Sequence, residues 1–329
     1  MPDKKMLRDF VETKTQSLKI MVVGDVMLDK YYYGEVTRIS PEAPVPINRI
    51  TVQKETLGGA ANVAHNLALL GAVTSIGGYV GDDYHGQALF DKFTARGIDY
   101  RGLVHNGAPT TTKLRIIGGH QQMLRLDFEE TAPVGGQYAA RLMSYIDLRI
   151  EEGLDAIILS DYNKGALTPE LMKHTIAVAH EAGIPVIIDP KGSDWDKYNG
   201  ADYLTPNLRE ISRILPYEIK NNDEDVIKAG RYAMEKYNLK NIIITRSEAG
   251  LSLITPDNVV HIPTIAREVF DVSGAGDTVI AVMALALAGG LNPEDGAYLA
   301  NTAASVVVGK LGTYAVSRQE LSQAVDEAE

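Results

Sequence analysis

The residues with the clearest chemical potential form the run 271–278, which reads DVSGAGDT. Its small residues let successive backbone N–H groups point into one space, and an apolar helix predicted over 279–288 adds partial positive charge there. Such a turn can bind a phosphate. A carboxylate is an unusual neighbour for a phosphate, unless it is there to accept a proton. The run therefore favours phosphoryl transfer to a hydroxyl, with Asp277 as general base. The alternative is a flexible turn in which Asp277 only caps the helix.

A second glycine cluster, Gly58 and Gly59, opens the sequence GGAAN, which ends at Asn62. An apolar helix is predicted to follow it over 63–70. The small residues permit close approach of a ligand, and the Asn62 amide can both donate a hydrogen bond to a hydroxyl and accept one. Taken alone, the cluster is also consistent with simple close packing of a helix on a strand.

Short β-branched runs predict the elements that position these clusters. Buried parallel strands are expected over 18–23, 156–159, 185–188 and 241–245. Amphipathic patterns between them predict helices over 169–182 and 223–237. Alternating strands and helices predict an α/β fold with a doubly wound parallel sheet, whose ligands bind at the carboxyl ends of the strands. Polar residues occur at those ends, namely Asp25, Asp161, Asp189, Lys191 and Arg246.

Two segments, 31–56 and 110–130, depart from this alternation of strands and helices. Apolar and charged residues alternate in KLRI (113–116) and MLRLD (123–127), and Gly118, Gly119 and His120 between them suit a hairpin turn. The pattern predicts a small separate sheet that acts as a lid and excludes water from a site. Its other face is predicted to pair with a second copy of the chain. The alternative is an ordinary antiparallel edge of the main sheet.

Composition limits the class of protein and of partner. A chain of 329 residues fits one large α/β domain with an elaboration, or two modest domains, and we take 1–329 as one domain. The chain has no cysteine, which excludes disulfides and thiolate zinc sites. A net charge of −11 argues against nucleic acid and against an anionic membrane as the main partner. The charged N-terminus is not a secretory signal, so we expect a cytoplasmic protein.

Considered together, the two glycine clusters resemble the ribokinase/PfkB family of sugar kinases. The likeness is carried by GGAANVAHNLALLGAVTSIGGYVG (58–81), DVSGAGDT, GDVMLD (24–29) and NLRE (207–210), and it covers nearly the whole chain. No GK[ST] follows a glycine loop, so the chain does not resemble P-loop enzymes. The resemblance implies a ribokinase-like, doubly wound, mostly parallel sheet with a small β-sheet lid over the α/β core.

The resemblance also assigns expected roles around the transferred phosphate and the sugar. Asp277 would be the base, and the backbone N–H groups of Gly274, Ala275 and Gly276 would form an anion hole. The expected sugar-binding residues are Asp25, Asp29, Gly58, Gly59 and Asn62. Asp29 matches the family's aspartate more closely than Asp25 does. For both carboxylates, a cap or turn is the alternative.

On the nucleotide side, the resemblance implies that Asn207 and Glu210 organise magnesium-bound waters, with Leu208 and Arg209 between them. A helix start with a capping box is a compatible alternative. The expected cofactors are ATP and Mg²⁺, with a monovalent cation such as K⁺ near Asp271. Further nucleotide contacts are expected from Thr245, Arg246, Glu248 and a segment 301–312 that begins at Asn301.

Longer stretches, including GDVMLDKYYYG, TRISPEAPVP, QQMLRLDFEE, SDYNKGAL and LTPNLRE, resemble the members of this family that act on D-glycero-D-manno-heptose 7-phosphate. Those kinases phosphorylate O1 and supply ADP-heptose for the lipopolysaccharide core. No HxGH motif occurs, so we expect a kinase without a nucleotidyltransferase domain. Kinases for another sugar or sugar phosphate, and a non-catalytic sugar-binding sensor, are the alternatives.

The distal phosphate of such a substrate requires cations. Lys113, Arg115 and Arg125 on the lid strands, Arg38, Lys164 and Lys191 are candidates. We favour Lys191, Lys164, Arg115 and Arg125, because strand ends and the lid face should converge on one cleft, and because arginine suits a bidentate phosphate contact. For each of them the alternative is an ordinary solvated surface charge.

Overall fold

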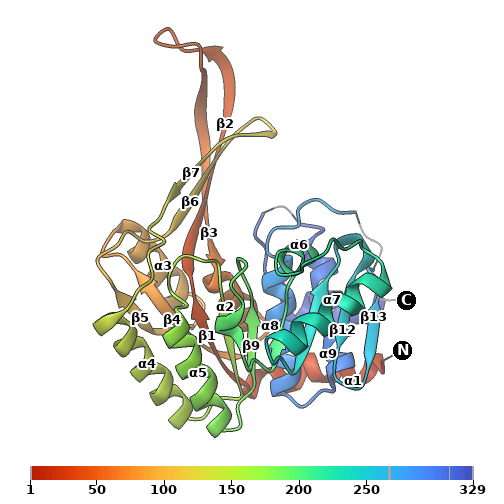
Figure 1. Ribbon diagram of the computed structural model, residues 1–329. Coiled ribbons are helices and arrows are strands. Elements are labelled where there is room, and N and C mark those ends of the chain that lie inside the picture. The colour runs from red at the N-terminus through yellow and green to blue at the C-terminus, as the bar shows by residue number, and fades with distance from the viewer. Residues whose placement is uncertain (1, 266–267, 311, 328–329) are drawn as a thin grey trace.

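A large mixed sheet forms the centre of the computed structural model, which describes residues 2–265, 268–310 and 312–327 (Figure 1). Within these residues the sheet has nine strands, in the order β13 (Val259–Ile262), β12 (Leu251–Ile254), β11 (Asn241–Thr245), β10 (Tyr203–Leu204), β9 (Val186–Asp189), β8 (Ala156–Ser160), β1 (Lys19–Gly24), β4 (Val73–Val80), β5 (Asp99–His105). Neighbours from β11 to β5 are parallel, and β12 is antiparallel to β11 and β13. The predicted doubly wound sheet is confirmed, and the four predicted strands lie within one residue of their observed bounds.

Helices cover both faces of this sheet, because consecutive strand residues point to opposite sides. Ile20 and Val22 of β1 belong to one core, whereas Met21 and Val23 belong to the other. The first core includes residues of α1 (Lys4–Asp9), α2 (Ala60–Leu69), α3 (Tyr84–Thr94), α8 (Ala275–Ala288), α9 (Pro293–Val307) and α10 (Arg318–Glu327). The second includes residues of α4 (Gly136–Glu151), α5 (Pro169–Glu181), α6 (Leu208–Ser212) and α7 (Asp223–Lys236).

Local chemistry explains where the predicted helices start. Thr168 caps α5, which has proline at its first position, and Asn222 caps α7. Helix α8 is buried without interruption from Asp277 to Ala286, because its sequence is apolar on every side and α9 packs on it. None of the helices described here is long and apolar enough to cross a membrane.

The segments with alternating polarity form a second sheet, as predicted, rather than an edge of the large sheet. Its strand order is β3 (Pro46–Gly59), β2 (Val26–Ile39), β6 (Thr112–Gly118), β7 (Gln121–Phe128). Strands β2 and β3 form a long antiparallel hairpin that projects away from the α/β body (Figure 1). The predicted hairpin turn joins β6 to β7, and Gly119 adopts a φ of +61° in it.

The small sheet has two chemically different faces near its base. Strand register places Asp29, Lys113 and Asp127 side by side, and likewise Tyr31, Arg115 and Arg125, so one face is charged. The alternate positions of β7 carry Leu124, Leu126 and Phe128, all of which are exposed. A polar face and an exposed apolar face on one sheet are what the alternating sequence predicts.

Candidate active site

The carboxylate of Asp277 lies in the first turn of α8 and is 4% exposed. Its Oδ2 accepts a hydrogen bond from Asn62 Nδ2 at 2.7 Å, and its Oδ1 accepts one from the Tyr162 hydroxyl at 2.6 Å. Gly274 precedes the helix with a φ of +84°, and a Cβ there would lie 3.1 Å from Asn62 Nδ2. The two glycine clusters of the sequence therefore meet at this carboxylate.

Burial raises the pKa of Asp277 to about 6, and the nearby charge of Asp29 adds to this effect. The hydrogen bonds from Asn62 and Tyr162 oppose the rise, as does the charge of Lys191. A carboxylate with this pKa is ionised at neutral pH, yet it is a stronger base than an exposed aspartate. These are the properties of a general base that takes a proton from a hydroxyl.

Polar contacts between α2 and α8 fix the positions of Asn62 and Asp277. Thr278 Oγ1 donates to Asn66 Oδ1 at 3.0 Å, and Asn66 Nδ2 donates to the Asn62 carbonyl at 2.9 Å. Asn62 Oδ1 is buried and accepts no hydrogen bond from the described residues. Because buried acceptors are normally paired, this atom suits a hydroxyl donated by a ligand.

A small cavity of about 130 Å³ adjoins Asp277. It brings predicted catalytic and nucleotide-side residues together; its lining consists of Tyr162, Asp189, Lys191, Thr205, Asn207, Glu210, Thr245, Gly274, Gly276 and Asp277. First-turn N–H groups of a helix have no intrahelical acceptor, which makes Gly276 N–H an anion donor here. The Ala275 N–H, in contrast, donates to the Val272 carbonyl at 3.3 Å, so this predicted anion-hole amide is occupied.

At the next strand end, Asn207 and Glu210 form the capping box of α6. Asn207 Oδ1 accepts from Glu210 N at 2.9 Å, and Glu210 Oε2 accepts from Asn207 N at 3.0 Å. Between them, Leu208 is half-exposed and Arg209 is exposed. The described residues contain no cluster of three or more metal-binding side chains. This donor set fits Mg²⁺ only through water, which is how Mg²⁺ often binds.

Lys191 follows β9 and lies at the small cavity, not on the small sheet. Its Nζ donates to Glu210 Oε1 at 2.6 Å, and it lines the cavity beside Asp277. The expectation that Lys191 grips a distal phosphate does not match this position. Asp189, which the sequence predictions left without a role, lies here too, and burial with the charges of Glu210 and Asp277 raises its pKa well above the usual value.

Asp29 and Arg115 form a partly buried ion pair at the base of the lid. Asp29 Oδ1 accepts from Arg115 Nη1 at 2.6 Å, and Asp29 is 6% exposed. A Cβ on Gly58 would lie 2.4 Å from Asp29 Oδ2, which explains the glycine. Gly59 has a φ of +55°, and a Cβ there would lie 2.6 Å from the Asp25 carbonyl.

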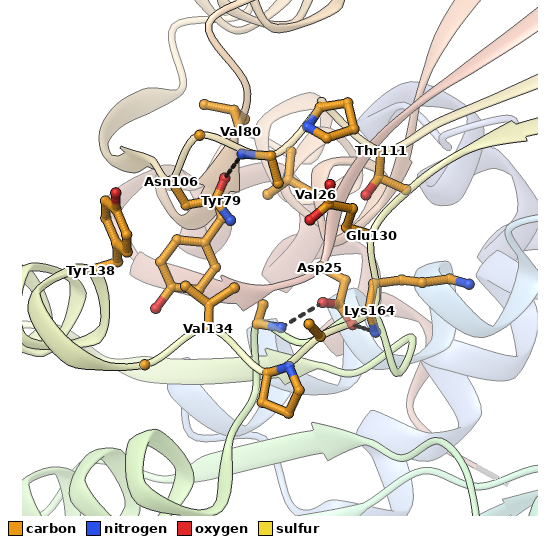
Figure 2. Close-up of a pocket in the computed structure, with 17 residues that line it drawn as sticks. Asp25, Val26, Tyr79, Val80, Asn106, Thr111, Glu130, Val134, Tyr138 and Lys164 are labelled. Carbon is orange, nitrogen blue, oxygen red and sulfur yellow. Dashed lines mark hydrogen bonds between the residues drawn. The ribbon is translucent and has the colours of Figure 1, made fainter.

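Asp25 is engaged by the protein backbone and does not reach Asp277. Its carboxylate accepts hydrogen bonds from the N–H groups of Tyr162, Lys164 and Ala166, at 2.7, 3.0 and 3.0 Å. Figure 2 shows the carboxylate aimed at this loop, beside a larger cavity of about 490 Å³ that Asp277 does not line. The predicted sugar-ligand role of Asp25 therefore conflicts with how its oxygens are used.

The remaining predicted cations differ in how they are paired. Lys164 Nζ pairs with Glu129 at 2.6 Å, and Arg125 pairs with Asp127 at 2.9 Å with half of its side chain exposed. Lys113 is half-buried and makes no ion pair with any described residue; its Nζ lies 6.0 Å from the Tyr162 ring centre. Burial and the charge of Lys164 lower the pKa of Lys113.

The residues predicted to contact ATP lie in different places, and only some of them line the small cavity. Thr245 lines the small cavity, but the buried Arg246 donates to Asp223 at 2.6 Å and does not line it. Glu248 accepts from Asn221 at 3.3 Å. Asn301 donates to the Pro263 carbonyl at 2.9 Å, which makes it an anchor of that loop. Position 311 of the predicted segment 301–312 lies outside the described residues.

Asp271 ties the start of the glycine run to the other side of the site. It accepts hydrogen bonds from Ser273 N at 2.9 Å and from Gly312 N at 3.0 Å. Although burial raises the pKa of Asp271, hydrogen bonds from the Ser273 side chain and from these two N–H groups, together with the charge of Arg115, outweigh it, so the pKa lies below the usual value. The group is therefore anionic where the sequence predicts a monovalent cation.

Tyr162 is the site residue that the sequence analysis missed. It lies directly after Asp161 at the carboxyl end of β8, within the stretch SDYNKG. Its position at a strand end was the available signal, but tyrosine is a less specific indicator of chemistry than the charged residues Asp161 and Lys164 beside it. Its contact with Asp277 links residues 115 positions apart.

Comparison with known proteins gives close relatives over most of the chain. Bifunctional protein HldE of Geobacter sulfurreducens is 46% identical over 307 residues, which cover 93% of this chain and 62% of that protein. Bifunctional protein HldE of Actinobacillus succinogenes is 46% identical over 308 residues, covering 93% and 63%. This chain thus spans less than two thirds of the length of these curated relatives.

Solved structures and a family profile agree with the fold. Escherichia coli phosphofructokinase-2, in complex with substrates and products, matches with a TM-score of 0.79 at 20% identity, covering 94% of this chain and 99% of that one. Arabidopsis thaliana ribokinase complexed with ribose and ATP matches at 0.75 and 21%, with the same coverage. The predicted ribokinase-like fold is confirmed. The profile described as pfkB family carbohydrate kinase matches residues 17–320, so the chain belongs to this family of carbohydrate kinases.

Proposed function

We propose that this chain is an ATP- and Mg²⁺-dependent kinase that phosphorylates D-glycero-D-manno-heptose 7-phosphate at O1. The chemistry is supported by one observation above all: the buried Asp277 carboxylate, held by Asn62 beside the first turn of α8. The choice of heptose rests on the longer sequence stretches and on the 46% identity to the HldE proteins.

In the proposed reaction, Asp277 takes the proton of the O1 hydroxyl as that oxygen attacks the γ-phosphorus of ATP in line, and the bond from that phosphorus to the β–γ bridging oxygen breaks to release ADP. The Gly276 N–H and the Lys191 ammonium stabilise charge on the transferred group, while Asn62 Oδ1 and Asp29 orient the sugar. Mg²⁺, held through water by Glu210 and Asn207, would neutralise the nucleotide phosphates when bound. A monovalent cation beside Asp271 would add to this neutralisation.

The proposal is tested by coupled ADP-release measurements across a panel of sugars and sugar phosphates, heptose 7-phosphate included. We expect turnover that depends on a sugar phosphate, with heptose 7-phosphate giving the highest kcat/KM. Turnover confined to an unphosphorylated sugar would refute the substrate while leaving the kinase activity intact. ATP use that no sugar stimulates would favour a sugar-binding sensor.

Lys113 is our candidate for the cation that binds the distal phosphate. It projects from the charged face of the lid, close to Tyr162 and Lys164, and no described carboxylate pairs with it. Lys164, Arg115 and Lys191 each already carry an anionic partner at 2.6 Å. A bound phosphate would stabilise the ammonium form of Lys113, which burial disfavours.

We expect Lys113→Met to raise KM for the phosphorylated sugar about ten- to a hundredfold, because one charge-assisted hydrogen bond to the phosphate is lost. KM for ATP should change less than about twofold. Lys54→Met is the control, because Lys54 is exposed on β3 of the same sheet. Initial-rate kinetics with each substrate varied would measure both constants. Equal changes in the two KM values would rule out Lys113 as the phosphate ligand.

We further propose that the chain forms a homodimer through the lid sheets. The exposed apolar side chains of Leu124, Leu126 and Phe128 lie together on β7, on the face opposite the charged one. Exposed apolar patches on a sheet favour association. Leu124→Lys should shift the species seen by sedimentation velocity from dimer to monomer; a wild-type chain that sediments as a monomer at all concentrations would exclude the dimer.

A further inference from the structure

Among the residues that the structure describes, Tyr162 is the one side chain outside the two glycine clusters that donates a hydrogen bond to Asp277, the proposed base. Its hydroxyl donates to Asp277 Oδ1 at 2.6 Å, while Asn62 donates to Oδ2 at 2.7 Å. The carboxylate is therefore held at both oxygens by two donors that come from different elements. A carboxylate has about four lone-pair positions, so each oxygen keeps one for a further donor.

The Tyr162 ring is itself held by charges and by its own backbone. Lys191 Nζ lies 5.8 Å and Lys113 Nζ 6.0 Å from the ring centre, within the range of cation–π attraction. The Tyr162 N–H donates to the buried Asp25 carboxylate at 2.7 Å. Ring and backbone are thus fixed independently of Asp277, which lets the hydroxyl set the orientation of the carboxylate rather than follow it.

We propose that Tyr162 is a positioning residue for the phosphoryl transfer: its hydroxyl holds Asp277 ionised and directs one of the free lone pairs of the carboxylate toward the acceptor hydroxyl of the sugar. This inference rests on the proposed function, because it concerns the base of that reaction. Tyr162 acts through Asp277 and takes no proton itself, since burial and the charges of Asp277, Asp189 and Asp29 raise the pKa of its phenol well above 10.

The groups around Tyr162 and Asp277 determine how the pKa of Asp277 changes when the Tyr162 hydroxyl is removed. Asp29 raises the pKa of Asp277, Lys191 lowers it, and the hydrogen bonds from Asn62 and Tyr162 lower it as well. Asp189 and Lys113 face the tyrosine, and Glu210 pairs with Lys191. Because Tyr162→Phe removes only a stabilising bond to the ionised carboxylate, the pKa of Asp277 must rise, and more of the base is protonated at neutral pH.

The test compares the pH dependence of kcat/KM for the sugar phosphate, at saturating ATP, in the wild-type chain and in Tyr162→Phe. For the wild type we expect an acid limb near pH 6, the pKa of Asp277. In Tyr162→Phe the limb should move up by about one pH unit, with a roughly fivefold loss at pH 6 that approaches about tenfold at lower pH and largely disappears at pH 9. ATP binding measured by calorimetry shows that the variant is folded.

Tyr145→Phe is the matched control, because the Tyr145 hydroxyl also donates to an aspartate, Asp99, at 3.1 Å. That contact lies at the amino end of β5, away from the carboxyl strand ends beside which Asp277 lies. The acid limb of Tyr145→Phe should coincide with that of the wild type. A loss of rate in Tyr162→Phe that is equal at every pH, or an unchanged rate, would overturn the inference. A wild-type chain without sugar-dependent turnover would instead refute the proposed function.

Discussion

Asp277→Asn should lower kcat by about 10²–10⁴-fold, the usual contribution of a general base, while leaving KM for ATP within about twofold. The substitution keeps the shape of the side chain. Its amide oxygen can still accept from Asn62, and the Tyr162 hydroxyl can turn to accept from the new NH₂ group, so the site should stay assembled. What disappears is the ability to take a proton. Steady-state kinetics with saturating sugar phosphate would measure the change.

Asp99→Asn is the control for this variant. Asp99 also accepts a hydrogen bond from a tyrosine hydroxyl, and Arg101 lowers its pKa to about 2, but it lies at the opposite end of the sheet. Its replacement should leave kcat within about twofold, as expected for surface positions away from the chemistry. Turnover of Asp277→Asn within tenfold of the wild type would show that Asp277 is not the base.

The α/β core was predictable because its signals are local. The run 241–245 is apolar and β-branched, and β11 occupies these same residues, Asn241–Thr245. Likewise, proline after Thr168 marks the start of α5 without any tertiary information. The two-faced lid sheet was visible in the alternation of KLRI, because side chains of a strand alternate between its faces.

The pairing of charges at the site was not predictable, because it depends on contacts between distant segments. Arg115, Lys164 and Lys191 each find a carboxylate that sequence alone does not assign to them. Lys113 was a candidate but not one of the four favoured cations, and of the three candidate lysines it is the one that pairs with no described carboxylate. The role of Tyr162 was not predictable for the same reason, since its hydrogen bond to Asp277 joins segments far apart in the chain.

For Asp25, the role predicted from the sequence differs from the contacts that the residue makes in the structure. As an aspartate just past the first predicted strand, where the family resemblance places sugar ligands, it was a reasonable candidate. In the structure its oxygens serve three backbone N–H groups of one loop, at Tyr162, Lys164 and Ala166. The pKa of Asp25 is nevertheless raised, because burial and the charge of Asp161 outweigh those bonds. The Asp25 carboxylate therefore holds the loop that carries Tyr162 in place.

Asp25→Ala should accordingly destabilise the protein by about 3 kcal/mol, because each buried N–H left without an acceptor costs about 1–3 kcal/mol and water can replace part of what is lost. Water has access, since Asp25 lines the larger cavity (Figure 2). Asp155→Ala is the control: Asp155 is exposed and accepts from a single backbone group, Lys19 N, so its loss should cost less than about 1 kcal/mol. Urea denaturation followed by circular dichroism would measure both.

The same variant distinguishes the structural role of Asp25 from the predicted sugar contact. If the carboxylate holds the loop, Asp25→Ala loses stability, and kcat falls with it because the Tyr162 hydroxyl no longer stays on Asp277. A sugar ligand would behave differently: KM for the sugar phosphate would rise while the free energy of unfolding stayed near the wild-type value. Asp25→Asn should lie between, because one amide oxygen can keep the two bonds to Tyr162 and Lys164 that now share Oδ2, whereas its NH₂ group would face the Ala166 N–H.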